Sequence, residues 1–182
     1  MSTGTDYHAL ADHPLVIEAV FEDMAVKQAV FAQLDAVMPA DAVLASNTSY
    51  LDVNALAAMT RDPSRILGLH FFAPAHVMKL LEVVRADQTG PRALATGAAL
   101  AKLLGKVAVV AGVCDGFIGN RIMSAYRRDC EFMLEEGAAA SADRCRDGAV
   151  WFCYGDLCRA GHERPRHRLG AAQGPCCGPA CR

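Results

Sequence analysis

The chain has 182 residues, a net charge of −2 at pH 7 and 53% hydrophobic residues. This composition fits one globular domain and excludes an intrinsically disordered chain, which would be poorer in apolar residues and more highly charged. The sequence has no apolar run of about 18 residues for a membrane span and no signal-peptide pattern at its N-terminus. The small negative charge argues against a nucleic-acid-binding surface, and a cytoplasmic location is the default expectation.

The composition changes abruptly near residue 138. Six of the eight cysteines lie after this point, and residues 138–182 hold seven Arg and no Lys against four Asp and Glu. Residues 1–137 hold 11 Lys and Arg against 16 Asp and Glu, so the two parts carry opposite net charge. This break indicates that the two parts need separate explanations.

Short apolar runs alternate with segments of helical periodicity through residues 1–137. In the first helical segment Val26, Val30 and Leu34 recur every four residues. Asp52 can cap the next helix, and Pro91 can open the one after it. We expect a buried strand at 15–20, further strands at 43–46, 66–72, 80–85 and 106–111, and helices at 21–38, 52–60, 91–104 and 116–137. This order predicts an α/β fold with a doubly wound sheet, followed by one long helix.

A glycine-rich phosphate loop is absent from the sequence. A dinucleotide-binding sheet normally opens with a strand, the loop Gly-x-Gly-x-x-Gly and a helix whose N-terminus holds the pyrophosphate. Gly112, Gly116 and Gly119 have a different spacing and follow the last expected strand. We expect either a fold that binds no nucleotide or a nucleotide-binding fold whose first half is missing.

The strongest candidates for chemistry are a histidine and a glutamate twelve residues apart. His70 lies near the end of an expected strand, where ligands meet an open α/β sheet, although a core histidine bound to a backbone carbonyl fits the same pattern. Glu82 stands in an apolar run, where a buried carboxylate needs a partner; on an edge strand it could instead face solvent. As a pair, they favour a general base oriented by a carboxylate, meeting at the carboxyl ends of neighbouring strands.

Other polar residues lie at expected turns and helix starts. The turn at 46–49, with the sequence Ser-Asn-Thr-Ser, follows a strand and faces the same crevice, although turn and capping chemistry explains it equally well. Asn120 follows the glycines before the long helix and fits an ordinary first-turn residue. At their spacing, Glu22 and Lys27 are most often solvated helix residues.

Five stretches of residues 6–137 carry a family pattern. They read VIEAVFE (16–22), ASNTS (45–49), GLHFFAPA (68–75), KLLEVV (79–84) and DGFIGNR (115–121). In order and spacing they closely resemble the NAD-dependent 3-hydroxyacyl-CoA dehydrogenases of fatty-acid β-oxidation, most of all the multifunctional enzymes that fuse a hydratase to the dehydrogenase. The resemblance implies an incomplete Rossmann-like domain that begins after the glycine loop, NAD as the cofactor and a 3-hydroxyacyl-CoA as the substrate.

The resemblance also implies a role for each candidate residue. His70 removes the proton of the substrate's 3-hydroxyl while hydride passes to the nicotinamide, and Glu82 orients His70. Ser49 and Asn120 match positions that contact the reacting oxygen. The positions near the nicotinamide half of the cofactor are matched by Glu22, Lys27 and Asn47. No metal site and no nucleic-acid partner is implied, and family members often dimerise through a helical domain that follows.

The family pattern predicts three segments. Residues 1–112 are the C-terminal portion of the NAD-binding domain, 113–137 are the first helix of the next domain, and 138–182 are an irregular, disordered tail. We interpret the tail as the product of a frameshift, because codons for residues 151–158 read one base over can encode Gly-Phe-Ala-Met-Gly-(Thr or Ile)-Phe-Ala, close to the relatives' sequence. A zinc-binding tail is the alternative, although its Cys and His residues lack Cys-x-x-Cys spacing, and a disulfide module is a third.

The sequence as a whole therefore predicts part of a 3-hydroxyacyl-CoA dehydrogenase that oxidises a 3-hydroxyl to a ketone with a His–Glu pair. Because no pyrophosphate loop is present, we expect little or no activity from this chain by itself. The alternative is a non-enzymatic truncated or pseudogene product that retains only part of the fold.

Overall fold

The computed structural model describes residues 3–137, which contain a five-stranded sheet and the helices around it. In chain order the elements are η1 (Tyr7–Leu10), β1 (Leu15–Glu18), α1 (Met24–Val37), β2 (Val43–Ser46), α2 (Val53–Ala57), η2 (Pro63–Arg65), β3 (Ile66–Phe71), β4 (Leu80–Arg85), α3 (Pro91–Leu103), β5 (Val107–Gly112) and α4 (Gly119–Glu135). The chain divides into two compact units after Arg121, inside α4. The predicted tail at 138–182 lies outside the described residues.

The sheet has the strand order β1-β2-β3-β4-β5. Neighbouring strands are parallel except β3 and β4, which are antiparallel. Only the segment 72–79 joins these two strands, and a parallel return needs a crossover of about a dozen residues or more. The predicted sheet is therefore confirmed but mixed. As a correction, Glu82 lies near the start of β4 and not at the carboxyl end of its strand.

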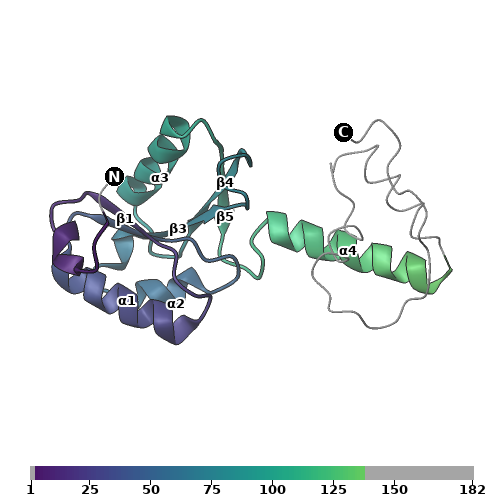
Figure 1. Ribbon diagram of the computed structural model, residues 1–182, viewed down its shortest axis with the longest axis horizontal. Coiled ribbons are helices and arrows are strands. Elements are labelled where there is room, and N and C mark those ends of the chain that lie inside the picture. Colours follow the sequence, from purple (N-terminus) through teal and green to yellow (C-terminus); the bar gives the residue numbers. More distant parts are fainter. Residues whose placement is uncertain (1–2, 138–182) are drawn as a thin grey trace. The chain divides into compact units, whose positions relative to one another are not determined.

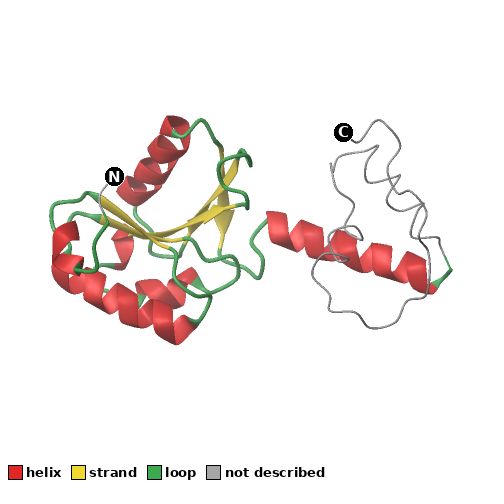
Figure 2. Cartoon of the chain, viewed as in Figure 1, coloured by secondary structure: helices red, strands yellow, loops and turns green. Residues whose placement is uncertain are grey.

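Helices cover both faces of the sheet, with α1 and α2 on one side and α3 on the other (Figures 1 and 2). The first layer packs around Phe31, Leu44 and Leu56, and the second packs on Leu67 and Val83. Strands β2, β3 and β4 lie between the layers and are almost wholly buried. Apolar residues at successive positions suit such strands, because both faces are covered. This arrangement confirms the predicted α/β class.

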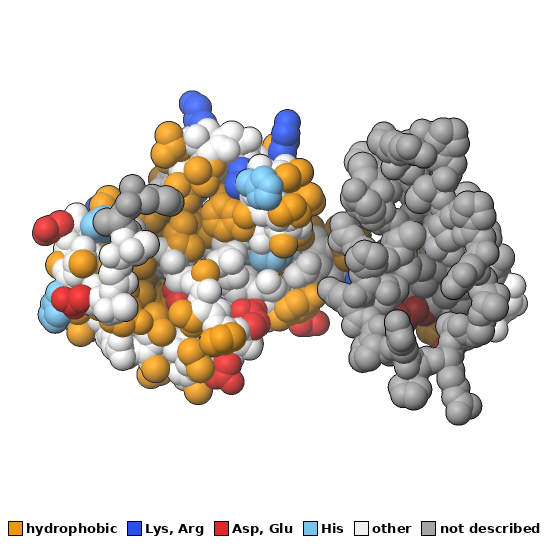
Figure 3. Space-filling model, in the orientation of Figure 1, with side chains coloured by type: hydrophobic (Ala, Val, Ile, Leu, Met, Phe, Trp, Pro, Cys, Tyr) orange, Lys and Arg blue, Asp and Glu red, His pale blue; other side chains and the backbone are white. Residues whose placement is uncertain are grey.

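The two outermost strands are more exposed than the three strands between them, although the first of the two was expected to be buried. In β5, Val107 and Val110 have 59% and 60% of their surface exposed, and β1 is only partly buried. Both strands lie at edges of the described sheet, where packing is incomplete. Apolar side chains accordingly remain on the surface of this unit, coloured orange in Figure 3.

Capping residues set the ends of the helices. Asp52 caps α2 and Pro91 opens α3, as predicted. Helix α1 begins at Met24 and not near Phe21, because the Asp23 side chain caps it. Within residues 3–137, every helix is too short or too polar to cross a bilayer.

Candidate active site

His70 and Glu82 face each other across the antiparallel strands β3 and β4. The two residues are direct partners in the strand register, which places their side chains on the same face of the sheet. The His70 Nδ1 lies 2.7 Å from the Glu82 Oε2. His70 is 4% exposed and Glu82 is 0% exposed. The structure thus brings the predicted pair together and excludes the alternative in which Glu82 faces solvent.

The second oxygen of Glu82 binds the turn that precedes α4. Gly116 and Phe117 have φ angles of 67° and 48°, and this left-handed turn delays the start of α4 from the expected Gly116. The N–H groups of Ile118 and Gly119 donate to the Glu82 Oε1 at 3.1 and 2.8 Å. Together with the imidazole, three donors satisfy the buried carboxylate, which offsets the cost of burying its charge.

The hydrogen bond to Glu82 determines which nitrogen of His70 carries the proton. An ionised carboxylate only accepts hydrogen bonds, so Nδ1 is protonated and Nε2 keeps its lone pair. The ring of Phe72 lies 4.4 Å from the imidazole, centroid to centroid, and that of Phe117 lies 5.8 Å away. The ring is therefore held in place, and the carboxylate stabilises the imidazolium that forms when Nε2 accepts a proton.

Asn47 joins the end of β2 to the ends of its neighbours. Its N–H donates to the carbonyl oxygen of Glu18 at 2.8 Å, and its Oδ1 accepts from the N–H of Phe71 at 2.9 Å. Because Phe71 follows His70 directly, Asn47 lies beside the base. The predicted turn at 46–49 is thereby placed at the same end of the sheet as the His–Glu pair.

Ser49 and Asn120 approach each other although 71 positions separate them. The Asn120 Nδ2 lies 3.5 Å from the Ser49 carbonyl oxygen, at the outer limit of a hydrogen bond. Asn120 follows Gly119, whose N–H binds Glu82. Both residues therefore lie near the His–Glu pair, and their contact with a substrate oxygen stays a prediction.

Glu22 lies in the loop before α1 and holds the turn that carries Ser49. Its Oε1 accepts from the Thr48 hydroxyl at 2.5 Å and from the N–H groups of Ser49 and Tyr50 at 2.7 and 3.1 Å. Burial raises the pKa of Glu22, but these hydrogen bonds and the charge of Lys27 lower it more, so its pKa lies below the ordinary value. Its side chain is 39% exposed, and the carboxylate can still reach a ligand.

Lys27 is buried, so the expectation of a solvated helix residue is wrong for this position. It is 1% exposed, and its ammonium lies 2.8 Å from the Glu18 Oε1 and 3.4 Å from the Glu22 Oε2. The first turn of α1 places it beside the end of β1. Two carboxylates compensate its buried charge, as a buried cation requires.

Glu18 is a buried charged residue that the sequence analysis missed. It lies at the end of β1 and is 4% exposed. Glu82 was predicted to be buried because it is a carboxylate within an apolar run. Glu18 is also a carboxylate within an apolar run, at 15–20, so the same argument predicts its burial.

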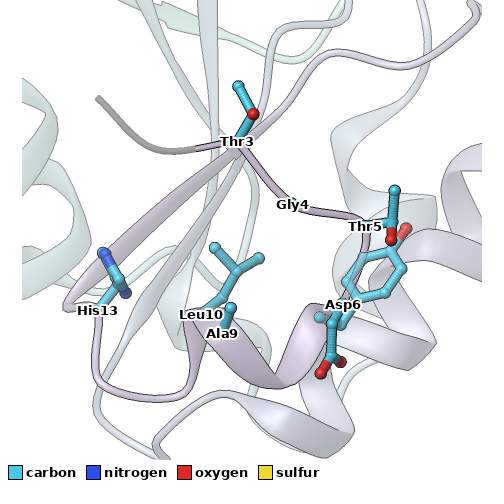
Figure 4. A pocket seen from close by; sticks show the side chains of 8 residues that line it. Thr3, Gly4, Thr5, Asp6, Ala9, Leu10 and His13 are labelled. Carbon is cyan, nitrogen blue, oxygen red and sulfur yellow. The ribbon is translucent and has the colours of Figure 1, made fainter.

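A cavity of about 540 Å³ lies within the N-terminal segment (Figure 4). Its lining residues are Thr3, Gly4, Thr5, Asp6, Tyr7, Ala9, Leu10 and His13. The lining includes no predicted site residue, so this cavity is not part of the candidate active site.

Among residues 3–137, no three His, Cys, Asp or Glu side chains gather as metal ligands; the zinc-binding alternative concerned the tail, outside the described residues.

Comparisons with known proteins agree with this geometry. Residues 1–114 match the family model described as 3-hydroxyacyl-CoA dehydrogenase, NAD binding domain. The chain is 53% identical over 129 residues to the peroxisomal bifunctional enzyme of Danio rerio, covering 71% of this chain and 18% of that protein. It is 42% identical over 132 residues to the glyoxysomal fatty acid β-oxidation multifunctional protein MFP-a of Brassica napus, covering 72% and 18%.

The solved structure of 3-hydroxybutyryl-CoA dehydrogenase from Escherichia coli K12 has the same fold. The two superimpose with a TM-score of 0.79 at 41% sequence identity. The match covers 85% of this chain and 33% of the chain of that structure. The chain thus spans 18% of the length of the two curated relatives above. The family match and the sequence identities lead to one conclusion: this chain belongs to the 3-hydroxyacyl-CoA dehydrogenase family, and its residues 1–114 match the NAD-binding domain of that family.

Proposed function

We propose that this chain carries the acid–base machinery of an NAD-dependent (S)-3-hydroxyacyl-CoA dehydrogenase of fatty-acid β-oxidation. The observation that supports the proposal most strongly is the buried contact of 2.7 Å between the His70 Nδ1 and the Glu82 Oε2. This contact leaves Nε2 as the basic nitrogen. A base of this kind suits the oxidation of a secondary alcohol to a ketone, because the hydroxyl proton must leave.

The proposed roles are those that the family resemblance implies for these side chains. The His70 Nε2 accepts the proton of the substrate's 3-hydroxyl, and Glu82 stabilises the resulting imidazolium. Ser49 and Asn120 hydrogen-bond the reacting oxygen. NAD, when bound, supplies the acceptor for the hydride that leaves C3. Together these groups convert (S)-3-hydroxyacyl-CoA into 3-oxoacyl-CoA.

The residues at the end of β1 fit the nicotinamide half of NAD. Glu22 offers a partly exposed carboxylate that can accept hydrogen bonds from sugar hydroxyls, and Phe21 beside it is 85% exposed. Asn47, which follows β2, donates its N–H to the carbonyl oxygen of Glu18 at the end of β1. Lys27 is too deeply buried to contact the cofactor directly, and it supports Glu22 through the ion pair between them. We assign no residue to the pyrophosphate, because the sequence has no Gly-x-Gly-x-x-Gly loop.

The organisation of the protein is part of the same proposal. We propose that residues 1–112 belong to the NAD-binding domain and that residues 113–137 begin a helical domain through which relatives of this kind dimerise. The frameshift interpretation of residues 138–182 stays a prediction that sequencing of the gene tests.

A cytoplasmic location also stays a prediction, and the two curated relatives carry the names peroxisomal and glyoxysomal instead.

Ligand titrations test the proposed reaction. NADH and acetoacetyl-CoA are added separately to the purified chain, and the ring protons of His70 are followed by NMR. We expect both ligands to shift these signals. Any NADH-dependent reduction of acetoacetyl-CoA should fall at least about 100-fold in His70→Gln, as expected for the loss of a general base. The control is His8→Gln, which changes an exposed histidine and should leave the rate unchanged.

Two outcomes would contradict the proposal. One is turnover that survives the His70→Gln substitution. The other is the absence of both turnover and ligand-induced shifts at His70, which would favour the non-enzymatic fragment.

A further inference from the structure

A buried charge cluster lies beside the proposed site and takes no direct part in the proposed proton transfer. It consists of Glu18, Lys27 and Glu22. The first two are 4% and 1% exposed, whereas the Glu22 side chain is 39% exposed. Burying an ion pair carries a desolvation cost that its mutual attraction often fails to repay. The buried Glu18–Lys27 ion pair is therefore weak evidence for a role in stability. Its other hydrogen bonds indicate a different role.

Glu18 links two strands and the turn that follows the second. Its Oε1 accepts from the Lys27 Nζ at 2.8 Å and from the Val20 N–H at 2.6 Å. Its Oε2 accepts from the Ser46 hydroxyl at 2.7 Å. The Ser46 oxygen in turn accepts from the N–H of Thr48 at 3.3 Å. One carboxylate at the end of β1 thus holds the end of β2 and the first residues of the turn.

Lys27 connects Glu18 to Glu22. Its ammonium lies between the two carboxylates, 2.8 Å from the first and 3.4 Å from the second. Glu22 then binds the N–H groups of Ser49 and Tyr50. The turn at 48–50 is therefore held by two groups: Ser46 accepts from its first N–H, and Glu22 accepts from the next two.

We propose that Glu18 is a positioning residue of the active site, which acts on the turn at 48–50 through Ser46 on one side and through Lys27 and Glu22 on the other. The proposal rests on the proposed function, because the position of this turn matters for the reaction only where Ser49 contacts the substrate. Lys27 then contributes to the cofactor side by its hold on Glu22.

A residue with a purely structural role would behave like Asp35. Asp35 is also a buried carboxylate of the α1 region, 6% exposed and paired with Arg61 and Arg65. It lies eight residues after Lys27, which is about 12 Å along a helix, and its side-chain hydrogen bonds and ion pairs within residues 3–137 go to Arg61 and Arg65 and not to the turn at 48–50. Asp35→Asn is therefore the matched control for Glu18→Gln.

Amide NMR spectra of the 182-residue chain test the proposal without any need for activity. In Glu18→Gln, the N–H signals of Ser49 and Tyr50 should shift at pH 7. The pH midpoint of Glu22, read from the same two signals, should fall, because the negative charge on the other side of Lys27 has been removed. Asp35→Asn should leave both the signals and the midpoint unchanged.

The proposal is overturned if Glu18→Gln leaves these amides in place, or if Asp35→Asn moves them equally. Should Glu18→Gln fail to fold, Ser46→Ala provides the second test, because it removes only one link to the turn. In that variant the Thr48 and Ser49 amides should shift, and unchanged amides would again overturn the proposal.

A kinetic comparison separates this inference from the proposed function. Where the wild-type chain reduces acetoacetyl-CoA with NADH, Glu18→Gln should lower kcat/KM by about tenfold, because misplaced contacts at a reacting centre are costly, and Asp35→Asn should not. Equal rates in Glu18→Gln and the wild type overturn the inference alone. A wild type that shows neither turnover nor ligand-induced shifts at His70 counts against the proposed function, and the amide signals still decide the role of Glu18.

Discussion

Glu82 is fully buried and accepts hydrogen bonds from three donors, the His70 imidazole and two backbone N–H groups. It therefore joins His70 to the turn before α4. One carboxylate thereby orients the proposed base and fixes the start of the helix that carries Asn120. Removal of its charge should affect both. The side-chain amide of glutamine presents donors as well as an acceptor, and it cannot satisfy His70 and the two backbone N–H groups in the present tautomer.

We expect Glu82→Gln to destabilise the chain by about 1–3 kcal/mol, the usual cost of an unsatisfied buried polar group. Urea denaturation measures the change. Glu131→Gln alters an exposed glutamate of α4 and should stay within about 0.5 kcal/mol of the wild type. Equal stability of Glu82→Gln and the wild type would show that the carboxylate is not needed to hold the turn.

At the scale of elements, the pairing of β3 with β4 brings His70 and Glu82 into contact. These strands approach closely where Gly68 is paired with Val84. A Cβ atom on Gly68 would lie 2.7 Å from the Val84 Cβ and 3.4 Å from the Val53 Cγ2. The Val84 Cβ is attached directly to the backbone and cannot rotate away. Glycine is therefore required here by close packing between β3, β4 and α2.

We expect Gly68→Ala to destabilise the chain by about 1–3 kcal/mol through overpacking. It should also shift the ring signals of His70, which lies two residues further along the same strand and faces the same side. Gly112→Ala is the control, because a Cβ atom at Gly112 meets no other atom within 4 Å. Thermal denaturation and NMR provide the two measurements, and a fully stable Gly68→Ala would contradict the close approach.

At the scale of the whole molecule, we expect acid unfolding to depend on Asp35. Its Oδ2 accepts from the N–H and Nε of Arg61 at 3.1 and 2.9 Å, and its Oδ1 contacts Arg65. Arg65 also donates to the carbonyl oxygen of Pro39 at 2.8 Å. These contacts join the end of α1 to the segment before β3. Burial raises the pKa of Asp35, but the bonds from Arg61 and Arg65 lower it more, so it lies below the ordinary value.

The sign of the pH dependence follows from this lowered pKa. Asp35 stabilises the fold above the pKa of the unfolded chain, about 3.9, and this contribution is lost as the pH falls through the lower pKa of the folded state. Asp35→Asn should therefore be less stable than the wild type at pH 7, and the difference should shrink below about pH 4. Urea midpoints from pH 2.5 to 7 provide the measurement, and a difference that stays constant with pH would contradict the prediction.

Features that depend on neighbouring residues were predicted well. Asp52 and Pro91 mark helix starts, because capping depends on backbone groups within one turn. The start of α1 was placed too early, because the apolar residues before Asp23 continue the helical pattern although the chain there is still in a loop. The burial of Lys27 could not be read from its spacing, since it depends on how α1 meets the end of β1.

The alternation of strands and helices could be predicted from the amino-acid sequence, and the family pattern in that sequence indicated the residues of the candidate site. Periodicity and caps encode these features within a few neighbouring positions. Three features became visible in the folded chain: β3 and β4 run antiparallel, Glu82 turns inward and binds both His70 and the turn before α4, and Glu18 and Lys27 share a buried charge cluster with Glu22. Each of these depends on which distant segments pack together, because a buried charge is stable only where the folded chain supplies its partners.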